Sequence, residues 1–164
     1  MVEINELSPG KLCNFIVHKH YQPIKQLLDD ISNYIKEWPA EANEAENLAV
    51  LSILFYRLQS EIEQLIRNDT LIIFPLIGND KQLEVRCLRR LPVELIQNKN
   101  RKIMYLLDKL RQLANNYIAR PLWSQHFRLF CNELHHLDQQ VLQTIYVKEN
   151  ILLPKVEKLF NQPN

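Results

Sequence analysis

Four polar residues lie at helical spacing within stripes that are otherwise apolar: His20, Asp69, Thr144 and Lys148. A buried charge without a partner is very unfavourable, so such residues are paired, bind a metal or lie outside the core. One His and one Asp are too few for a di-metal cage between facing helices, and a Lys ammonium has no acceptor to offer a metal. A lone His on an apolar stripe is more often a core residue with one hydrogen bond than a ligand. The residues alone leave these alternatives open.

The remaining histidines and nucleophiles show no catalytic pattern. His135 and His136 are adjacent, so on a helix they point about 100° apart and cannot both face one metal. Cys13, Cys87 and Cys131 are too few and too scattered for a disulfide framework or a zinc site. No Ser or Cys is matched with a His and an Asp in a triad-like arrangement. The sequence therefore predicts no catalytic residue and favours a protein that is not an enzyme.

The apolar spacing around these candidates is helical almost throughout. Ser8 followed by Pro9 is typical of a helix start, and Pro75 with Gly78 indicates a helix end. We expect four helices, over about residues 9–38, 42–78, 103–119 and 123–160. Residues 79–100 are polar and mixed, and we expect them to form the longest connection, with room for a short helix at 92–97.

Four long amphipathic helices predict an all-α, up-down four-helix bundle. A chain of 164 residues suits one domain, which we assign to residues 1–164 with a core over about 8–160. Hydrophobic residues make up 46% and charged residues 24%, so the chain can bury a proper core.

Composition and charge exclude several classes of function. The chain has 2 glycines, which leaves no glycine-rich phosphate loop. The net charge is +1, so no global field attracts nucleic acid or an anionic membrane, and we expect neither partner. The first residues are acidic and contain no apolar run, and the cysteines suit a reducing compartment. We therefore expect a cytoplasmic protein.

Four segments occur in an order and spacing that point to one family: Phe15–Tyr21, Asp69–Pro75, Leu91–Asp108 and Lys148–Pro154. The second reads DTLIIFP and resembles the EExxLFP signature of hemerythrin-like domains. The fourth, KENILLP, resembles the ENNxLFP signature of the same domains. The first, FIVHKHY, and the third, with LPV followed by IMYLLD, are similar to the YIVxxHH and P…M..EHD segments of the iron–sulfur-cluster-repair di-iron proteins.

This resemblance implies the fold but not the chemistry of the family. Hemerythrin-like domains hold two irons through His residues and two bridging carboxylates. His20 matches the first His, and Asp69 matches the first bridging carboxylate. The other four matched positions hold residues of other types: Leu65, Leu107, Thr144 and Lys148. Two irons need roughly ten ligand atoms from oxygen and imidazole donors. The resemblance therefore predicts a hemerythrin-like bundle that has lost its di-iron site and has no metal or other cofactor.

The replacements are physically coherent. A Lys148 ammonium opposite the Asp69 carboxylate can take over the charge of the metal, while Leu65 and Leu107 fill the volume of His rings and irons. We therefore expect a buried ion pair between Asp69 and Lys148, with His20 close by.

Two functions follow from the resemblance. The first is a metal-free, non-enzymatic role in binding or regulation, in a bacterium responding to nitrosative or oxidative stress. The alternative is an iron-binding protein with a remodelled site that uses His20, Asp69 and Glu149. A bundle that has lost a cofactor can also keep a cavity for a small molecule. The partner, a protein or a small molecule, and the oligomeric state, a homodimer included, stay open.

Overall fold

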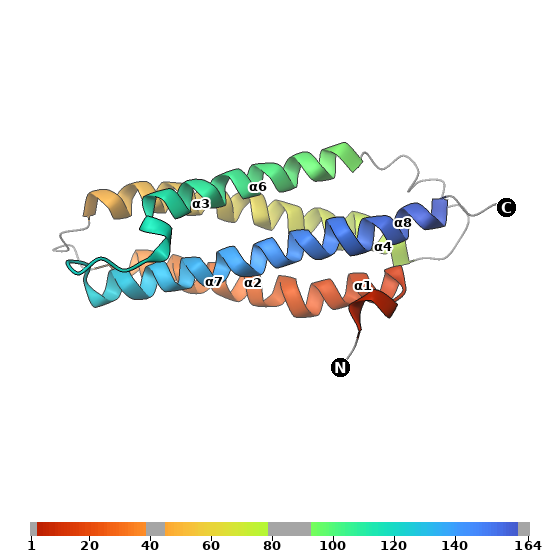
Figure 1. Ribbon diagram of the computed structural model, residues 1–164, viewed down its shortest axis with the longest axis horizontal. Coiled ribbons are helices and arrows are strands. Elements are labelled where there is room, and N and C mark those ends of the chain that lie inside the picture. Colours follow the sequence, from red (N-terminus) through yellow and green to blue (C-terminus); the bar gives the residue numbers. More distant parts are fainter. Residues whose placement is uncertain (1–2, 39–44, 79–92, 161–164) are drawn as a thin grey trace.

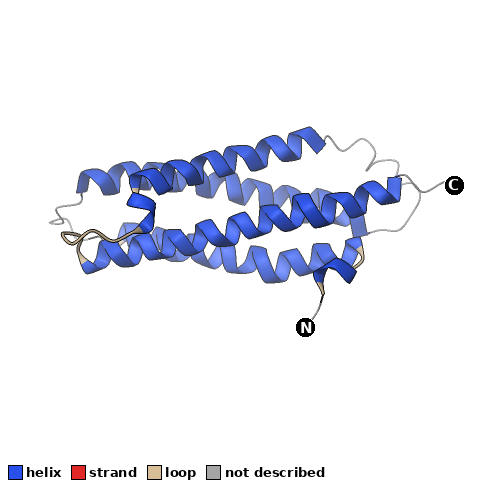
Figure 2. Ribbon diagram, in the orientation of Figure 1, coloured by secondary structure: helices blue, strands red, loops and turns tan. Residues whose placement is uncertain are grey.

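The structure is a computed structural model that describes residues 3–38, 45–78 and 93–160. Within these residues the regular elements are all helical, and no strand is present (Figure 2). The predicted all-α four-helix bundle is confirmed. Among the described helices, none combines the length and apolar character needed to cross a membrane.

The described residues form four long helical segments, three of which contain a π-helical stretch. Their elements, in chain order, are α1 (Pro9–Ile16), η2 (Val17–Tyr21), α2 (Gln22–Lys36), α3 (Ala45–Asn68), η3 (Asp69–Ile73), α4 (Phe74–Gly78), α6 (Val93–Leu113), α7 (Gln125–Val147), η5 (Lys148–Leu152) and α8 (Leu153–Phe160). Two short 3-10 turns, η1 (Ile4–Glu6) and η4 (Asn115–Tyr117), accompany them. Figure 1 shows that each long segment runs along the bundle in the direction opposite to the one before it. Helix α3 packs against α6, and α2 packs against α7.

Local signals explain the helix starts. The Ser8 hydroxyl accepts a hydrogen bond from the Lys11 amide, with Pro9 at the first helical position. The Ser124 hydroxyl caps α7 in the same way, by accepting a hydrogen bond from the Phe127 amide at 3.1 Å.

The chain's two glycines lie where α1 approaches α4, since a Cβ at position 10 would be 3.4 Å from the Gly78 Cα.

Each of the three π-helical stretches lies at the same distance from a following proline. Each ends two residues before Pro23, Pro75 or Pro154, and the intervening amide donates to the carbonyl five residues earlier. Proline lacks an amide hydrogen and its ring clashes with the carbonyl four residues before it, so a regular α-helix is unfavourable there. A wider π turn moves that carbonyl, and such turns often lie at functional sites. Pro75 therefore accompanies a π-helical turn within the second segment, and the helix continues past it to Gly78.

The third helix begins earlier than the sequence suggested. Residues 93–100, expected within the connection, belong to α6, and the expected short helix at 92–97 is the start of that helix where it is described. Val93, Ile96, Asn100 and Ile103 repeat every three or four residues, and the last two are buried. The polar residues between them obscured this stripe in the sequence. Residues 79–92 lie outside the described residues.

An ion pair between the partly exposed Arg111 and the buried Asp138 joins the other end of α6 to α7. Arg111 donates from Nε to Asp138 Oδ2 at 2.6 Å and from Nη2 to Oδ1 at 2.8 Å. The Tyr117 hydroxyl donates to Oδ2 at 2.9 Å. Residues Asn115 to Tyr117 all have positive φ, a region that Asn tolerates better than Tyr. The Asp138 carboxylate thus helps to hold a strained turn, a role that was not expected from the sequence.

We predict that Asp138→Ala lowers the free energy of unfolding by about 2–3 kcal/mol, because it removes three charge-assisted hydrogen bonds from a carboxylate that is 3% exposed. Urea denaturation measures this change. Asp108→Ala is the matched control, since that carboxylate lies 3.9 Å from Arg111 and is half exposed. It should change stability by less than about 0.5 kcal/mol. Equal effects of the two substitutions would contradict the assignment.

Candidate functional site

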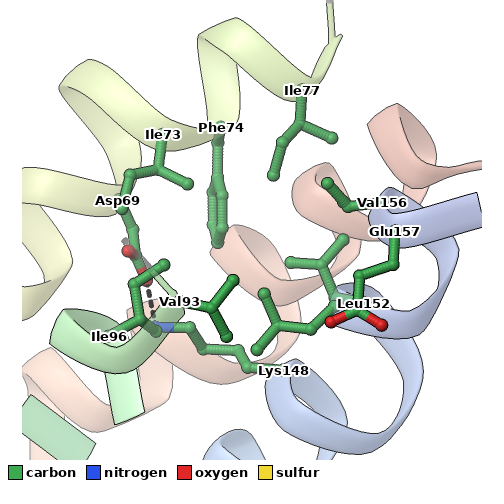
Figure 3. A pocket seen from close by; sticks show the side chains of 11 residues that line it. Asp69, Ile73, Phe74, Ile77, Val93, Ile96, Lys148, Leu152, Val156 and Glu157 are labelled. Carbon is green, nitrogen blue, oxygen red and sulfur yellow. Dashed lines mark hydrogen bonds and ion pairs between the residues drawn. The ribbon is translucent and has the colours of Figure 1, made fainter. Parts of the chain in front are cut away.

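Asp69 and Lys148 form an ion pair in the interior of the bundle. Asp69 is the first residue of η3, and Lys148 is the first residue of η5. The Lys148 ammonium donates to Asp69 Oδ2, and the side chains of Lys148 and Asp69 are only 5% and 4% exposed. Figure 3 shows the Lys148 side chain extending from its helix towards the carboxylate. The ion pair expected from the sequence is therefore present.

Tyr21 completes this cluster. Its hydroxyl donates to the same carboxylate oxygen, and its ring stacks on Phe74 with the centroids 5.9 Å apart. Burial, together with the neighbouring negative charge of Asp69, raises the pKa of Tyr21 well above 10.0, so the phenol stays protonated and donates. Tyr21 was not among the site residues expected from the sequence. Its spacing of three and seven residues from Ile24 and Leu28 was the available signal.

His20 and Thr144 form a second contact, one helical turn before Lys148. The His20 Nδ1 lies 3.1 Å from the Thr144 hydroxyl oxygen. That hydroxyl already donates to the Gln140 carbonyl at 2.7 Å, so the arrangement assigns the Nδ1 hydrogen to His20 as donor. Burial lowers the pKa of His20 from 6.5, which favours the neutral ring. His20 is thus a core histidine with a hydrogen bond.

The two leucines at matched ligand positions differ in their surroundings. Leu65 is buried one turn before Asp69 and lines a small cavity together with Thr144 and Lys148. Leu107 is fully buried but does not line the cavities described beside the ion pair. On α6, the residue that lines the same small cavity as Leu65 is Asn100, two helical turns before Leu107.

Asn100 is a buried polar residue that the sequence analysis placed in a connection. It is fully buried, and its amide nitrogen donates to Glu149 Oε1 at 3.0 Å. Its carbonyl oxygen accepts no hydrogen bond from the described residues. Glu149 therefore faces Asn100, while its neighbour Lys148 takes the place opposite Asp69.

The donor set does not fit a di-iron centre. Among the residues that the structure describes, no three His, Cys, Asp or Glu side chains gather where they could hold a metal ion. Asp69 accepts from an ammonium, Glu149 accepts from Asn100, and His20 faces Thr144. The structure therefore does not bring together the three residues of the alternative iron site.

The buried thiols are poor nucleophiles. Burial raises the pKa of both Cys13 and Cys131 to about 12, and the charge of Asp69 adds to the effect at Cys13. Both thiols stay protonated near neutral pH, and the thiolate is the reactive form. Cys87 lies outside the described residues.

The ion pair forms a shared wall between two cavities. Four residues line both: Asp69, Ile73, Ile96 and Lys148. The smaller cavity, of about 30 Å³, has apolar walls that include Phe74 and Val156 (Figure 3). The larger has a volume of about 210 Å³ and lies between the end of α3 with η3 and the start of α6.

We predict that Lys148→Met lowers the free energy of unfolding by ~3–5 kcal/mol, because it leaves the Asp69 charge buried. Asp69→Leu with Lys148→Met, in a Tyr21→Phe background that avoids a stranded phenol, should cost much less. A double-mutant cycle by chemical denaturation measures the coupling. The exposed pair Lys102–Glu61 is the control and should couple by less than about 1 kcal/mol. Coupling near zero at Asp69 and Lys148 would refute the assignment.

We also predict that protonation of His20 makes the protein less stable as the pH decreases. Since the folded state lowers the pKa of His20 below 6.5, the unfolded chain takes up a proton first as the pH falls. The free energy of unfolding should therefore decrease below about pH 6.5, by at most about 1.4 kcal/mol per pH unit for this group. His20→Gln should reduce this slope, whereas His136→Gln at an exposed position should retain it. Denaturation at several pH values decides between them.

Comparisons with protein families and with curated proteins give no match for this chain. The resemblance to hemerythrin-like domains therefore rests on the four sequence segments and on the residues within them.

Proposed function

We propose that this protein is a metal-free hemerythrin-like bundle that acts by binding and not by catalysis. The observation that carries the proposal is the Lys148 ammonium on the Asp69 carboxylate. The sequence resemblance matches these two positions to the bridging carboxylates of the family. An ammonium there supplies a positive charge to Asp69 without metal coordination.

The shared register of η3 and η5 supports this match. Asp69 and Lys148 each open a π-helical stretch, six residues before Pro75 and Pro154 respectively. The two positions are thus equivalent in the two halves of the chain, as the two carboxylates of the signatures are.

Binding is favoured over catalysis by what surrounds the pair. The buried thiols are protonated and the phenol of Tyr21 is held as a donor to Asp69. The largest feature beside the pair is a cavity with mainly apolar walls. From the resemblance we further propose a binding or regulatory role in the cytoplasm of a bacterium under nitrosative or oxidative stress.

We predict that the purified protein binds no stoichiometric iron, whereas Leu65→His, Thr144→His and Lys148→Glu together create an iron site with His20 and Asp69. Leu65, Thr144 and Lys148 line one cavity, so their replacements should converge. Iron content and an iron-dependent rise in Tm measure the result, since a ligand of the folded state stabilises it.

The matched control for this design replaces Leu65→His by Leu107→His and keeps the other two substitutions. Leu107 does not line the described cavities beside the pair, so this variant should bind iron more weakly. Stoichiometric iron on the unmodified protein would overturn the proposal and favour the site with His20, Asp69 and Glu149.

A further inference from the structure

We propose that the 210 Å³ cavity beside the ion pair binds a small carboxylate with an apolar body. The inference rests on the proposed binding function and names the chemical class of its ligand. The cavity lies between α3 with η3 and α6, and the residues that line it are Leu65, Asn68, Asp69, Ile72, Ile73, Leu95, Ile96, Lys99 and Lys148.

The walls and the volume favour an apolar body of limited size. Five of the nine lining residues are Leu or Ile. An engineered apolar cavity of about 150 Å³ is large enough for benzene, so 210 Å³ suits a molecule of about ten non-hydrogen atoms. Ile72 and Leu95 are 57% and 53% exposed, which places them at a mouth open to solvent. A ligand can therefore enter without unfolding the bundle.

The charge of the lining favours an anion. Lys148 and Asp69 neutralise each other, so Lys99 leaves the lining with one uncompensated positive charge. Among the ion pairs of the described residues, none includes Lys99. Asn68 is the other polar residue of the lining, and it carries no charge. A carboxylate next to Lys99 thus gains a charge-assisted hydrogen bond while its apolar body leaves water.

These features disfavour the related ligand classes. A cationic amphiphile would meet the Lys99 ammonium, and a neutral alcohol would gain no ionic contact. An inorganic anion would satisfy Lys99 but leave the apolar walls without contacts. Apolar walls, together with a Lys99 that has no ion-pair partner among the described residues, favour a molecule that carries both an apolar body and a negative charge.

Three probes of equal chain length test this inference: octanoate, octan-1-ol and octylammonium. Isothermal titration calorimetry on the full chain, below micelle-forming concentrations, should show octanoate binding about tenfold more tightly than octanol, the effect of one charge-assisted hydrogen bond at a partly exposed site. Octylammonium should bind most weakly.

Lys99→Met keeps an apolar stem and removes the charge, so the affinity for octanoate should fall to within about threefold of that for octanol. Lys109→Met is the matched control. It makes the same change in net charge on the same helix, at a lysine that lies over the Tyr105 ring and not in the cavity. This control should bind octanoate like the parent, and circular dichroism checks that both variants are folded.

Three results would overturn the inference: equal affinity of the parent for octanoate and octanol, no binding of either probe, or equal losses in the two lysine variants. Light scattering would detect a dimer of the parent in which octanoate cannot bind. That result would also overturn the inference, because a second copy of the chain would then cover the cavity mouth. None of these results bears on iron. An iron-free protein that binds no octanoate would retain the proposed metal-free function, whereas stoichiometric iron on the parent would overturn that function itself.

Discussion

The burial of one ammonium group governs the centre of this bundle. Lys148 is 4% exposed, and a lone charge there would be very unfavourable, so it requires a carboxylate within contact distance. Asp69 supplies the carboxylate from a different helical segment, and Tyr21 from a third segment donates to the same oxygen. Three of the four segments are thus joined by one buried carboxylate. Replacing any one of these three residues therefore changes the hydrogen bonding or charge balance of the other two.

The backbone at this level differs from a regular α-helix for a reason that lies in the sequence. Pro23, Pro75 and Pro154 each follow a π-helical stretch, and those stretches contain Tyr21, Asp69 and Lys148. A proline in a helix interior excludes the usual hydrogen bond and crowds the carbonyl four residues earlier, and the wider turn relieves both. The same prolines therefore shape all three segments that supply the polar cluster.

The polar side chains at the centre contact one another, and apolar space lies beside them. Asp69 Oδ2 accepts hydrogen bonds from the Lys148 ammonium and the Tyr21 phenol. His20 contacts the Thr144 hydroxyl, which donates to the Gln140 carbonyl, and Asn100 donates to Glu149. The space beside the ion pair is mainly apolar and opens past Ile72 and Leu95, and its lining includes Lys99, which forms no ion pair with the residues that the structure describes. This combination is typical of a binding site, in which a few polar groups orient a ligand within apolar walls.

Periodicity alone was sufficient for the fold class and for several site residues. The stripes at spacings of three and four residues predicted the helical segments, and His20, Asp69, Thr144 and Lys148 were identified because they interrupt those stripes. The resemblance to hemerythrin-like domains matched Asp69 and Lys148 to two neighbouring positions, and their opposite charges then predicted that they pair, because neither is stable alone in a core. Only the tertiary structure decided which neighbours completed the site. Tyr21 was hidden because an aromatic residue fits an apolar stripe, and Asn100 and Asp138 were hidden because polar residues are usually exposed. Glu149 and Lys148 are adjacent in sequence, and the direction of each side chain in the wide turn, which no spacing rule predicts, determines that the ammonium faces Asp69 while the carboxylate faces Asn100.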